Sequence, residues 1–260
     1  MKKTISILVM FIAFLSFASA QMTSTKSLKS AIDNNSVICI DARSAGDYNV
    51  SHIKGAINID VMTLCDGNSM KSPSTMASIF AANGVSKNSA IVIYCKTGLR
   101  AGRMYFILKY MGATNVKCLH GNMAGWVAGR KPVTNKATKK SGGSFSAGSN
   151  SSMVCDKAYV QSKMGSASTV IVDTRSADEY GAGHVDGAIN IPYTYFNNPE
   201  TKLKSSGELT ALFNGKGVTS SKEVILYCKT SSSASYAWFI LHELLKYPNV
   251  KVFEGGYSAW

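Results

Sequence analysis

The sequence predicts an α/β fold that is built twice, with each copy forming a parallel sheet flanked by helices. Three blocks recur in the same order, and the spacing from His52 to His184 differs by only one position from that between Cys95 and Cys228. Such a repeat in register indicates a duplicated domain. The apolar runs are nearly continuous in Val and Ile, as in strands buried on both faces of a sheet. The recurring blocks are Asp-x-Arg (41–43 and 173–175), His-x-x-Gly-Ala-Ile-Asn-Ile (52–59 and 184–191) and Tyr-Cys-Lys-Thr (94–97 and 227–230).

The elements follow the same order in both copies. In the first copy, the sequence predicts a helix at 99–111, which Gly112 ends. It also predicts strands at 36–41, 55–59, 90–94 and 116–119. The second predicts a helix at about 233–246 and strands at 169–173, 187–191, 223–227 and 250–253. Between the copies the chain is rich in Lys, Gly and Ser, as linkers are, and Phe145 alone offers an anchor. We therefore predict domain 1 at 21–130, a linker at 131–152 and domain 2 at 153–260.

Residues 1–20 have the pattern of a secretory signal peptide. Lys2 and Lys3 precede an apolar run from residue 5 to residue 17, and Ala-Ser-Ala follows at 18–20. The run is shorter than the ~20 apolar residues that span a bilayer. We therefore expect cleavage before Gln21 and export to the bacterial periplasm, with a retained N-terminal anchor as the alternative.

The chain is strongly basic, with a formal net charge of +13. Such a field favours anionic ligands, anionic lipid surfaces or acidic partners. Nucleic acid fits badly with export, and no nucleic-acid recognition motif accompanies the charge. We therefore expect small anionic ligands rather than nucleic acid.

The six cysteines do not follow the spacing of a disulfide scaffold or a zinc site, because no Cys-x-x-Cys pair occurs. An exported protein can form disulfides, so the sequence leaves the pairing of Cys39, Cys65, Cys118 and Cys155 open. Cys39 and Cys118 lie in apolar runs, where a buried inert thiol is expected. We expect neither a metal nor a cofactor.

Cys95 stands where a buried strand ends and a turn leads into a helix. Ligands of open α/β sheets bind beyond the carboxyl ends of the strands, and such a turn points backbone N–H groups at an anion. We expect this setting to lower the pKa of Cys95 from its usual ~8.5. Gly98 lets the backbone bend closely around the sulfur, and Arg100 adds a fixed cation. The alternative is an inert cysteine at a strand end.

Taken in order, Asp-x-Arg, the His-x-x-Gly-Ala-Ile-Asn-Ile block, the strand-Cys-loop-helix and a Gly-rich turn with Trp resemble the landmarks of tandem rhodanese-type sulfurtransferases. The resemblance covers nearly all of the mature chain, twice. It implies the rhodanese-like fold in both domains and a loop cysteine that accepts a sulfane sulfur as a persulfide and passes it on. Donors in the family include thiosulfate, 3-mercaptopyruvate and polysulfide, and acceptors include cyanide and thiols.

The resemblance makes Cys95 and Cys228 the candidate nucleophiles. The first loop reads Cys-x4-Arg, which suits a single sulfur, whereas related phosphatases and arsenate reductases carry a longer Cys-x5-Arg loop. The second loop has serine in place of both Gly98 and Arg100. Local chemistry favours Cys95 and the family's domain order favours Cys228, so Cys95 is ranked first and Cys228 is kept. The candidate substrate-binding residues are Lys96, Thr97, Gly98, Leu99 and Arg100 in the first loop, and Lys229, Thr230, Ser231, Ser232 and Ser233 in the second.

The other repeated polar residues are expected to be structural. Ion pairs within each Asp-x-Arg block would brace the strand ends, and a thiolate nucleophile needs no histidine relay. Arg103, one helical turn beyond Arg100, is expected either at the mouth of the pocket or in solvent. The predicted structural residues are Asp41, Arg43, His52, Asp173, Arg175 and His184.

Three functions compete at this point. The leading one is an exported sulfurtransferase that cycles through a cysteine persulfide. The second is a sulfur carrier that takes polysulfide sulfur to a membrane-associated sulfur enzyme with little turnover of its own. The third is a non-catalytic interaction module, which the two retained cysteines disfavour.

Overall fold

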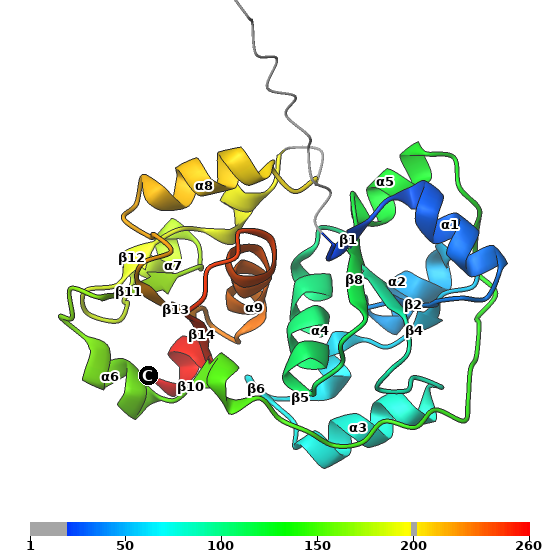
Figure 1. Ribbon diagram of the computed structural model, residues 1–260, viewed down its shortest axis with the longest axis horizontal. Coiled ribbons are helices and arrows are strands. Elements are labelled where there is room, and N and C mark those ends of the chain that lie inside the picture. The colour runs from blue at the N-terminus through cyan, green and yellow to red at the C-terminus, as the bar shows by residue number, and fades with distance from the viewer. Residues whose placement is uncertain (1–19, 199–201) are drawn as a thin grey trace, which may run out of the picture.

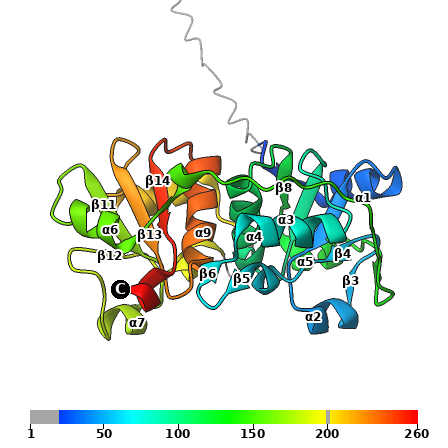
Figure 2. The ribbon, with the colours of Figure 1, turned by 90° about the horizontal axis from the view of Figure 1, so that it is seen from below.

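Two five-stranded parallel sheets form the centres of two domains that lie side by side (Figure 1; Figure 2). The computed structural model describes residues 20–198 and 202–260, so the predicted signal peptide lies outside the described residues except for Ala20. The strand order is β1-β8-β7-β2-β4 in the first sheet and β10-β14-β13-β11-β12 in the second, and each of these pairings is parallel. The duplicated α/β fold is therefore confirmed.

The predicted central strands are present, and their bounds differ from the predictions mainly at the ends. Edge strands β1 and β10 were missed, because a two-residue strand carries no periodicity. The first sheet consists of β1 (Met22–Thr23), β2 (Ile38–Asp41), β4 (Ile57–Asn58), β7 (Ile91–Tyr94) and β8 (Val116–Leu119). The second consists of β10 (Val154–Cys155), β11 (Thr169–Asp173), β12 (Ile189–Asn190), β13 (Glu223–Tyr227) and β14 (Val250–Phe253). Two further antiparallel pairs join β3 (His52–Ile53) to β9 (Val133–Thr134), which lies far away in the sequence, and β5 (Cys65–Asp66) to β6 (Ser69–Met70) in a short hairpin.

Helices pack on both faces of the first sheet. Phe80 and Met104 join the core on one face, whereas Leu28 and Trp126 join a separate apolar cluster on the other. The helices of domain 1 are α1 (Thr25–Asp33), α2 (Ala45–Val50), α3 (Pro73–Ala82), α4 (Leu99–Tyr110) and α5 (Asn122–Ala128). Those of domain 2 are α6 (Lys157–Lys163), α7 (Ala177–Gly181), α8 (Ser206–Asn214) and α9 (Ser232–Trp238), which continues as a π-helical segment over Phe239–Leu244.

Each Asp-x-Arg block forms a buried ion pair. Arg43 Nη2 lies 2.6 Å from the Asp41 carboxylate and also donates to the Ser51 carbonyl. Arg175 Nη2 lies 2.5 Å from Asp173 in the same arrangement. These contacts tie the end of a central strand to the following loop.

Each repeated histidine stacks on a tyrosine four residues earlier. The His52 ring lies 3.6 Å from that of Tyr48, with Nδ1 2.8 Å from the Tyr48 carbonyl oxygen, and His184 repeats this against Tyr180. Because a carbonyl oxygen only accepts, Nδ1 carries the proton in both rings.

The domains meet where α4 packs directly against α9 (Figure 1). Gly102 permits this approach, because a Cβ there would lie 2.7 Å from Tyr236 Cδ2. The Phe106 and Trp238 rings also meet edge-to-face, at 5.2 Å. The shared interface therefore consists of close helix packing and aromatic contacts.

Arg103 lies wholly inside this interface, which corrects the expectation of a pocket-mouth or solvated arginine. Its side chain is fully buried, and Nη2 lies 2.6 Å from the Glu254 carboxylate of domain 2. Its Nη1 donates to the Ser235 hydroxyl at 3.0 Å. The helix period could not reveal this, because α4 is buried on almost every side.

The linker follows domain 1 as a packed segment. The Phe145 ring stacks at 4.9 Å on that of Phe80 in α3, so the lone aromatic of the linker acts as the anchor that the sequence suggested. Lys87 N donates to the Ser144 carbonyl, and Asn150 N to that of Tyr110. Among the helices of residues 20–198 and 202–260, none is long and apolar enough to cross a membrane.

We expect Arg103→Met to lower the free energy of unfolding by about 3 kcal/mol, because it removes one member of a buried ion pair and leaves the other unpaired. Urea unfolding at pH 7 measures this. Lys29→Met is the control, because it breaks the exposed Lys29–Asp33 pair and should change stability by less than about 0.5 kcal/mol. Equal effects of the two substitutions would contradict the structural role of the interface pair.

Candidate active site

The sulfur of Cys95 lies within a turn of backbone N–H groups between β7 and α4. The Gly98 N–H donates to Sγ, with a nitrogen-to-sulfur distance of 3.1 Å. The N–H groups of Thr97, Arg100 and Ala101 also favour the thiolate electrostatically. The loop thus directs backbone N–H groups at the sulfur, which is the arrangement from which the sequence predicted an anion-binding turn.

Burial outweighs this stabilisation. Cys95 is only 2% exposed, and the loss of hydration raises the pKa of its thiol above the ordinary value, although the four N–H groups act in the opposite direction. The expectation of a lowered pKa was therefore wrong. That expectation included the N–H groups of the loop but not the burial of the loop beneath domain 2, which disfavours the thiolate.

Asn122, at the start of α5, holds the base of the loop. Its Oδ1 accepts from the Cys95 backbone N–H at 3.1 Å, and Met123 N donates to the Cys95 carbonyl at 3.0 Å. Asn122 takes a positive φ of 51°, which asparagine tolerates better than most residues. This role was missed, because Asn122 resembles an ordinary turn residue in the sequence.

Arg100, the cation that the sequence predicted beside the sulfur, lies in the first turn of α4. Arg100 Nη1 lies 3.5 Å from the Asp60 carboxylate, and its side chain is 39% exposed. Lys96, next to the cysteine, is exposed. Both side chains are therefore accessible to solvent, where they can attract an anion.

Domain 2 covers the first loop. Asn197 Nδ2 donates to the Thr97 carbonyl at 2.9 Å, and the Tyr236 hydroxyl donates to Asn197 Oδ1 at 2.8 Å. A Cβ on Gly98, whose φ is +101°, would lie 2.9 Å from the Tyr236 hydroxyl. Asn197 and Tyr236 could not be identified from the sequence, because they lie about a hundred residues or more from the loop they contact.

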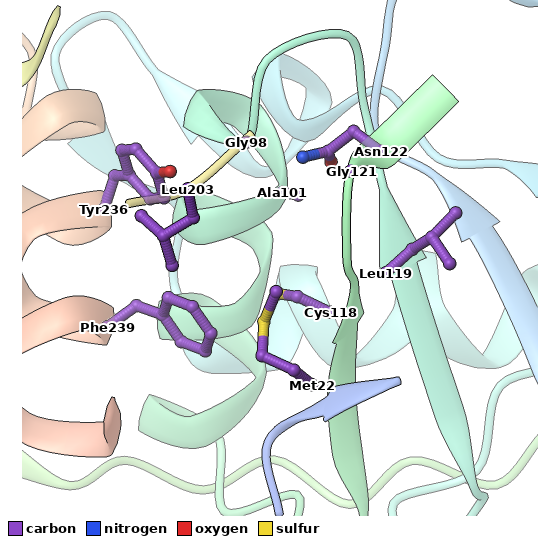
Figure 3. Close-up of a pocket in the computed structure, with 10 residues that line it drawn as sticks. All are labelled: Met22, Gly98, Ala101, Cys118, Leu119, Gly121, Asn122, Leu203, Tyr236 and Phe239. Atoms are coloured by element: carbon purple, nitrogen blue, oxygen red, sulfur yellow. The ribbon is translucent and has the colours of Figure 1, made fainter. Parts of the chain in front are cut away.

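A small pocket opens beside the loop, between the two domains (Figure 3). Gly98 and Ala101 line it from the loop and α4, and Tyr236 lines it from α9 (Figure 3). Its other walls are largely apolar and include Cys118. Cys118 is buried, as expected, and lies close enough to Cys95 for the two thiols to interact electrostatically. The remaining lining residues are Met22, Leu119, Gly121, Asn122, Leu203 and Phe239.

The second loop has a different construction. Cys228 is 4% exposed, and within residues 20–198 and 202–260 its sulfur has no hydrogen-bond donor of the kind that Gly98 provides for Cys95. Ser231 adopts the left-handed conformation of Gly98, with a φ of 61°. Its hydroxyl is used structurally, since it accepts from Gly255 N and donates to the Phe253 carbonyl.

Arg100 of the first loop has no cationic counterpart in the second. Ser233 replaces Arg100, and its hydroxyl lies 2.7 Å from that of Thr174 inside the domain. Pro192 occupies the place that corresponds to Asp60 in the repeat. Both members of the ion pair are thus replaced together. The remaining candidates, Lys229, Thr230 and Ser232, lie on this loop, where Thr230 and Ser232 face each other at 3.4 Å.

All six cysteines lie in the described residues and carry free thiols. Cys39 is buried, and burial raises the pKa of its thiol, as expected for an inert side chain. Burial also raises the pKa of Cys155 to about 12. Cys65 is half-buried and lies 4.0 Å from Arg103 Nη2.

We expect Gly98→Ala to lower the free energy of unfolding by about 2–3 kcal/mol, because it combines a strained φ with a contact against Tyr236. Gly187→Ala is the matched control, since Gly187 has a φ of +77° with open space around it and should cost about 1 kcal/mol. Chemical unfolding of both variants tests this. A loss for Gly98→Ala no larger than that for Gly187→Ala would show that Tyr236 does not press on the loop.

Comparison with known proteins places this geometry in a family. The family model for the rhodanese-like domain matches residues 24–129 and, a second time, residues 156–260. The chain is 30% identical to the 3-mercaptopyruvate sulfurtransferase of Escherichia coli K12, covering 88% of this chain and 90% of the relative. It is 28% identical to the sulfur carrier protein TtuD of Thermus thermophilus, covering 82% and 83%.

A solved structure shares the arrangement of both domains. SseA from Escherichia coli, a 3-mercaptopyruvate sulfurtransferase, superposes with a TM-score of 0.85 at 28% identity, covering 91% of this chain and 98% of that one. Both domain matches, the sequence relatives and this superposition agree. The chain therefore belongs to the rhodanese-like family, as a tandem-domain protein of the rhodanese-type sulfurtransferases.

Proposed function

We propose that this protein is an exported sulfurtransferase that moves a sulfane sulfur from a small anionic donor to a thiol or cyanide, through a persulfide on Cys95. The observation that carries the proposal is the Cys95 sulfur inside a turn of backbone N–H groups, beside a pocket. A nucleophilic sulfur in an anion-binding turn suits transfer of a group that carries negative charge in both the donor and the bound form.

The reaction has two displacements. The Cys95 thiolate, formed by loss of its proton to solvent, attacks the outer sulfur of the donor. The bond from that sulfur to the rest of the donor breaks, and the donor remnant leaves with the electron pair. The acceptor thiolate or cyanide then attacks the outer sulfur of the persulfide, and Cys95 leaves as a thiolate. No external oxidant or reductant is needed, because each displacement exchanges one bond to sulfur for another.

The loop assists both displacements electrostatically. Backbone N–H groups that already point at Sγ need no reorganisation when charge develops on the sulfur. A buried site strengthens these interactions, because little water screens them. The Cys-x4-Arg loop encloses one sulfur and is shorter than the loops that hold tetrahedral oxyanions.

The donor is proposed to be anionic because the loop that begins at Cys95 carries two cationic residues. Arg100 and Lys96 are partly or fully exposed near the sulfur, and the whole chain is strongly basic. The name of the Escherichia coli relative supports 3-mercaptopyruvate as a donor. Thiosulfate and polysulfide are the other candidates from the resemblance.

Cys228 is proposed to be secondary. Its loop keeps the thiol but lacks a counterpart of Arg100, and Ser231 and Ser233 direct their hydroxyls to structural partners. Export to the periplasm is proposed from the N-terminal sequence alone.

A sulfur carrier is the second candidate, and the name of the Thermus thermophilus relative supports it. In this case Cys95 would accept polysulfide sulfur and hold it for a membrane-associated sulfur enzyme. The site suits retention, because Cys95 is buried and little solvent reaches its sulfur. A carrier forms the persulfide but shows little turnover with free acceptors.

We expect Cys95→Ser to reduce sulfur transfer from thiosulfate or 3-mercaptopyruvate to cyanide by about a thousandfold, because the nucleophile is lost. Cys228→Ser should stay within about twofold of the wild type. Thiocyanate formation measures both rates. Loss of activity in Cys228→Ser with retention in Cys95→Ser would move the working site to domain 2, whereas a Cys95 persulfide without thiocyanate would favour the carrier.

The pH dependence follows from the burial of Cys95. Because burial raises the pKa of this thiol, the reactive thiolate is a minor species at neutral pH. We expect its alkylation rate to rise about tenfold per pH unit from about pH 6 to 8.5, without a plateau. Iodoacetamide labelling of the Cys95 peptide in a Cys228→Ser background measures the profile. A plateau near pH 7 would show instead that the N–H groups outweigh burial.

A further inference from the structure

The peptide unit between Thr97 and Gly98 is held at both of its polar ends. Its N–H donates to Cys95 Sγ at 3.1 Å, and its carbonyl accepts from Asn197 Nδ2 of domain 2 at 2.9 Å. A trans peptide is planar, and its N–H and C=O point in opposite directions. A partner that fixes the carbonyl therefore also fixes the direction of the N–H.

This peptide needs such a partner, because glycine follows it. Gly98 has a φ of +101°, and glycine populates positive and negative φ about equally well. Rotation of the peptide would turn its carbonyl oxygen toward the sulfur. That orientation would repel a thiolate or a persulfide anion instead of stabilising it.

The orientation of Asn197 is itself determined by its neighbours. The Thr97 carbonyl only accepts, so the amide nitrogen of Asn197 must face it. The Oδ1 atom then accepts from the hydroxyl of Tyr236, which is only 3% exposed. A chain of donors thus runs from Tyr236 through Asn197 to the loop of the other domain.

We propose that Asn197 and Tyr236 of domain 2 are positioning residues, which hold the Thr97–Gly98 peptide with its N–H toward the Cys95 sulfur. The proposal rests on the proposed role of Cys95 as the working nucleophile. It assigns to domain 2 a part in sulfur transfer that does not require Cys228.

The corresponding device is absent from the second loop. In the repeat, Cys65 takes the place of Asn197 at the end of an equivalent 3₁₀ turn, and Arg103 takes the place of Tyr236. The Arg103 guanidinium donates its hydrogen bonds to Glu254 and Ser235 instead. Within the described residues, no side chain of domain 1 donates to the Thr230 carbonyl.

Other groups near Cys95 do not reproduce the expected effect. Burial raises the pKa of both Cys118 on β8 and Tyr236 on α9, so both stay neutral at moderate pH. Arg100 on α4 is permanently cationic, and exposed Lys96 precedes Thr97 in the loop. A neutral substitution at Asn197 removes a hydrogen-bond acceptor of Tyr236 but changes the charge of none of these groups.

The test is the rate of Cys95 alkylation by iodoacetamide as a function of pH, in a Cys228→Ser background and resolved by peptide. Asn197→Leu removes the donor at nearly constant size and without new charge. We expect alkylation at pH 8 to fall about tenfold and the profile to move to higher pH, because one hydrogen bond to the thiolate is lost. Asn197→Ala should act in the same direction, and Tyr236→Phe should give a smaller decrease.

Cys65→Ser is the matched control at the equivalent position of domain 1, and its rate should stay within about twofold of the wild type. An unchanged or faster rate at Cys95 in Asn197→Leu, Asn197→Ala and Tyr236→Phe overturns the proposal. Unfolding cannot imitate the expected result, because it exposes Cys95 and accelerates alkylation. The readout requires no sulfur transfer, so a failure of the proposed function is recognised separately by the absence of turnover in the wild type.

Discussion

The packing of α4 against α9 is the contact on which the rest of the structure depends. Each helix begins at one of the two cysteine loops, so their contact brings both loops into the interface between the domains. Gly102 lets the helices approach, and the fully buried Arg103 pairs with Glu254 across the contact. The environment of Cys95 is therefore not a property of domain 1 alone.

The two loops differ in sets of contacting residues rather than at isolated positions. In domain 1, Arg100 faces Asp60, whereas serine and proline occupy both corresponding places in domain 2. Replacing both members of an ion pair leaves no charge without its partner. The residues of the facing domain differ as well. Tyr236 and Asn197 of domain 2 form a chain of hydrogen bonds to the Cys95 loop, and the Cys228 loop receives no equivalent chain within the described residues. The structure thus joins one loop whose Gly98 N–H donates to its cysteine sulfur to one whose serine hydroxyls bond within their own domain.

Much of the fold could be predicted from sequence, because its signals are local or repeated. Continuous Val and Ile runs marked the central strands, and the repeated blocks marked the duplication. The first cysteine loop was found for the same reason, since its Gly98 and Arg100 lie within a few residues of the sulfur.

Contacts between the domains could not be predicted in this way. Asn197 and Tyr236 reach the Cys95 loop from the other domain, and nothing in their local sequence identifies them. The sign of the Cys95 pKa shift was missed for the same physical reason, because a second domain supplies part of the burial that opposes the thiolate. Arg103 was misplaced because α4 has no solvent face around it.

The central claim is that the first loop, completed by domain 2, is where sulfur is held. Peptide-resolved mass spectrometry of the wild-type protein, after incubation with a sulfane donor and trapping of persulfides, tests it most directly. We expect the mass of one added sulfur on the peptide that contains Cys95, with little on the peptide that contains Cys228. Sulfur found only on Cys228, or on neither cysteine with any sulfane donor, would contradict the account.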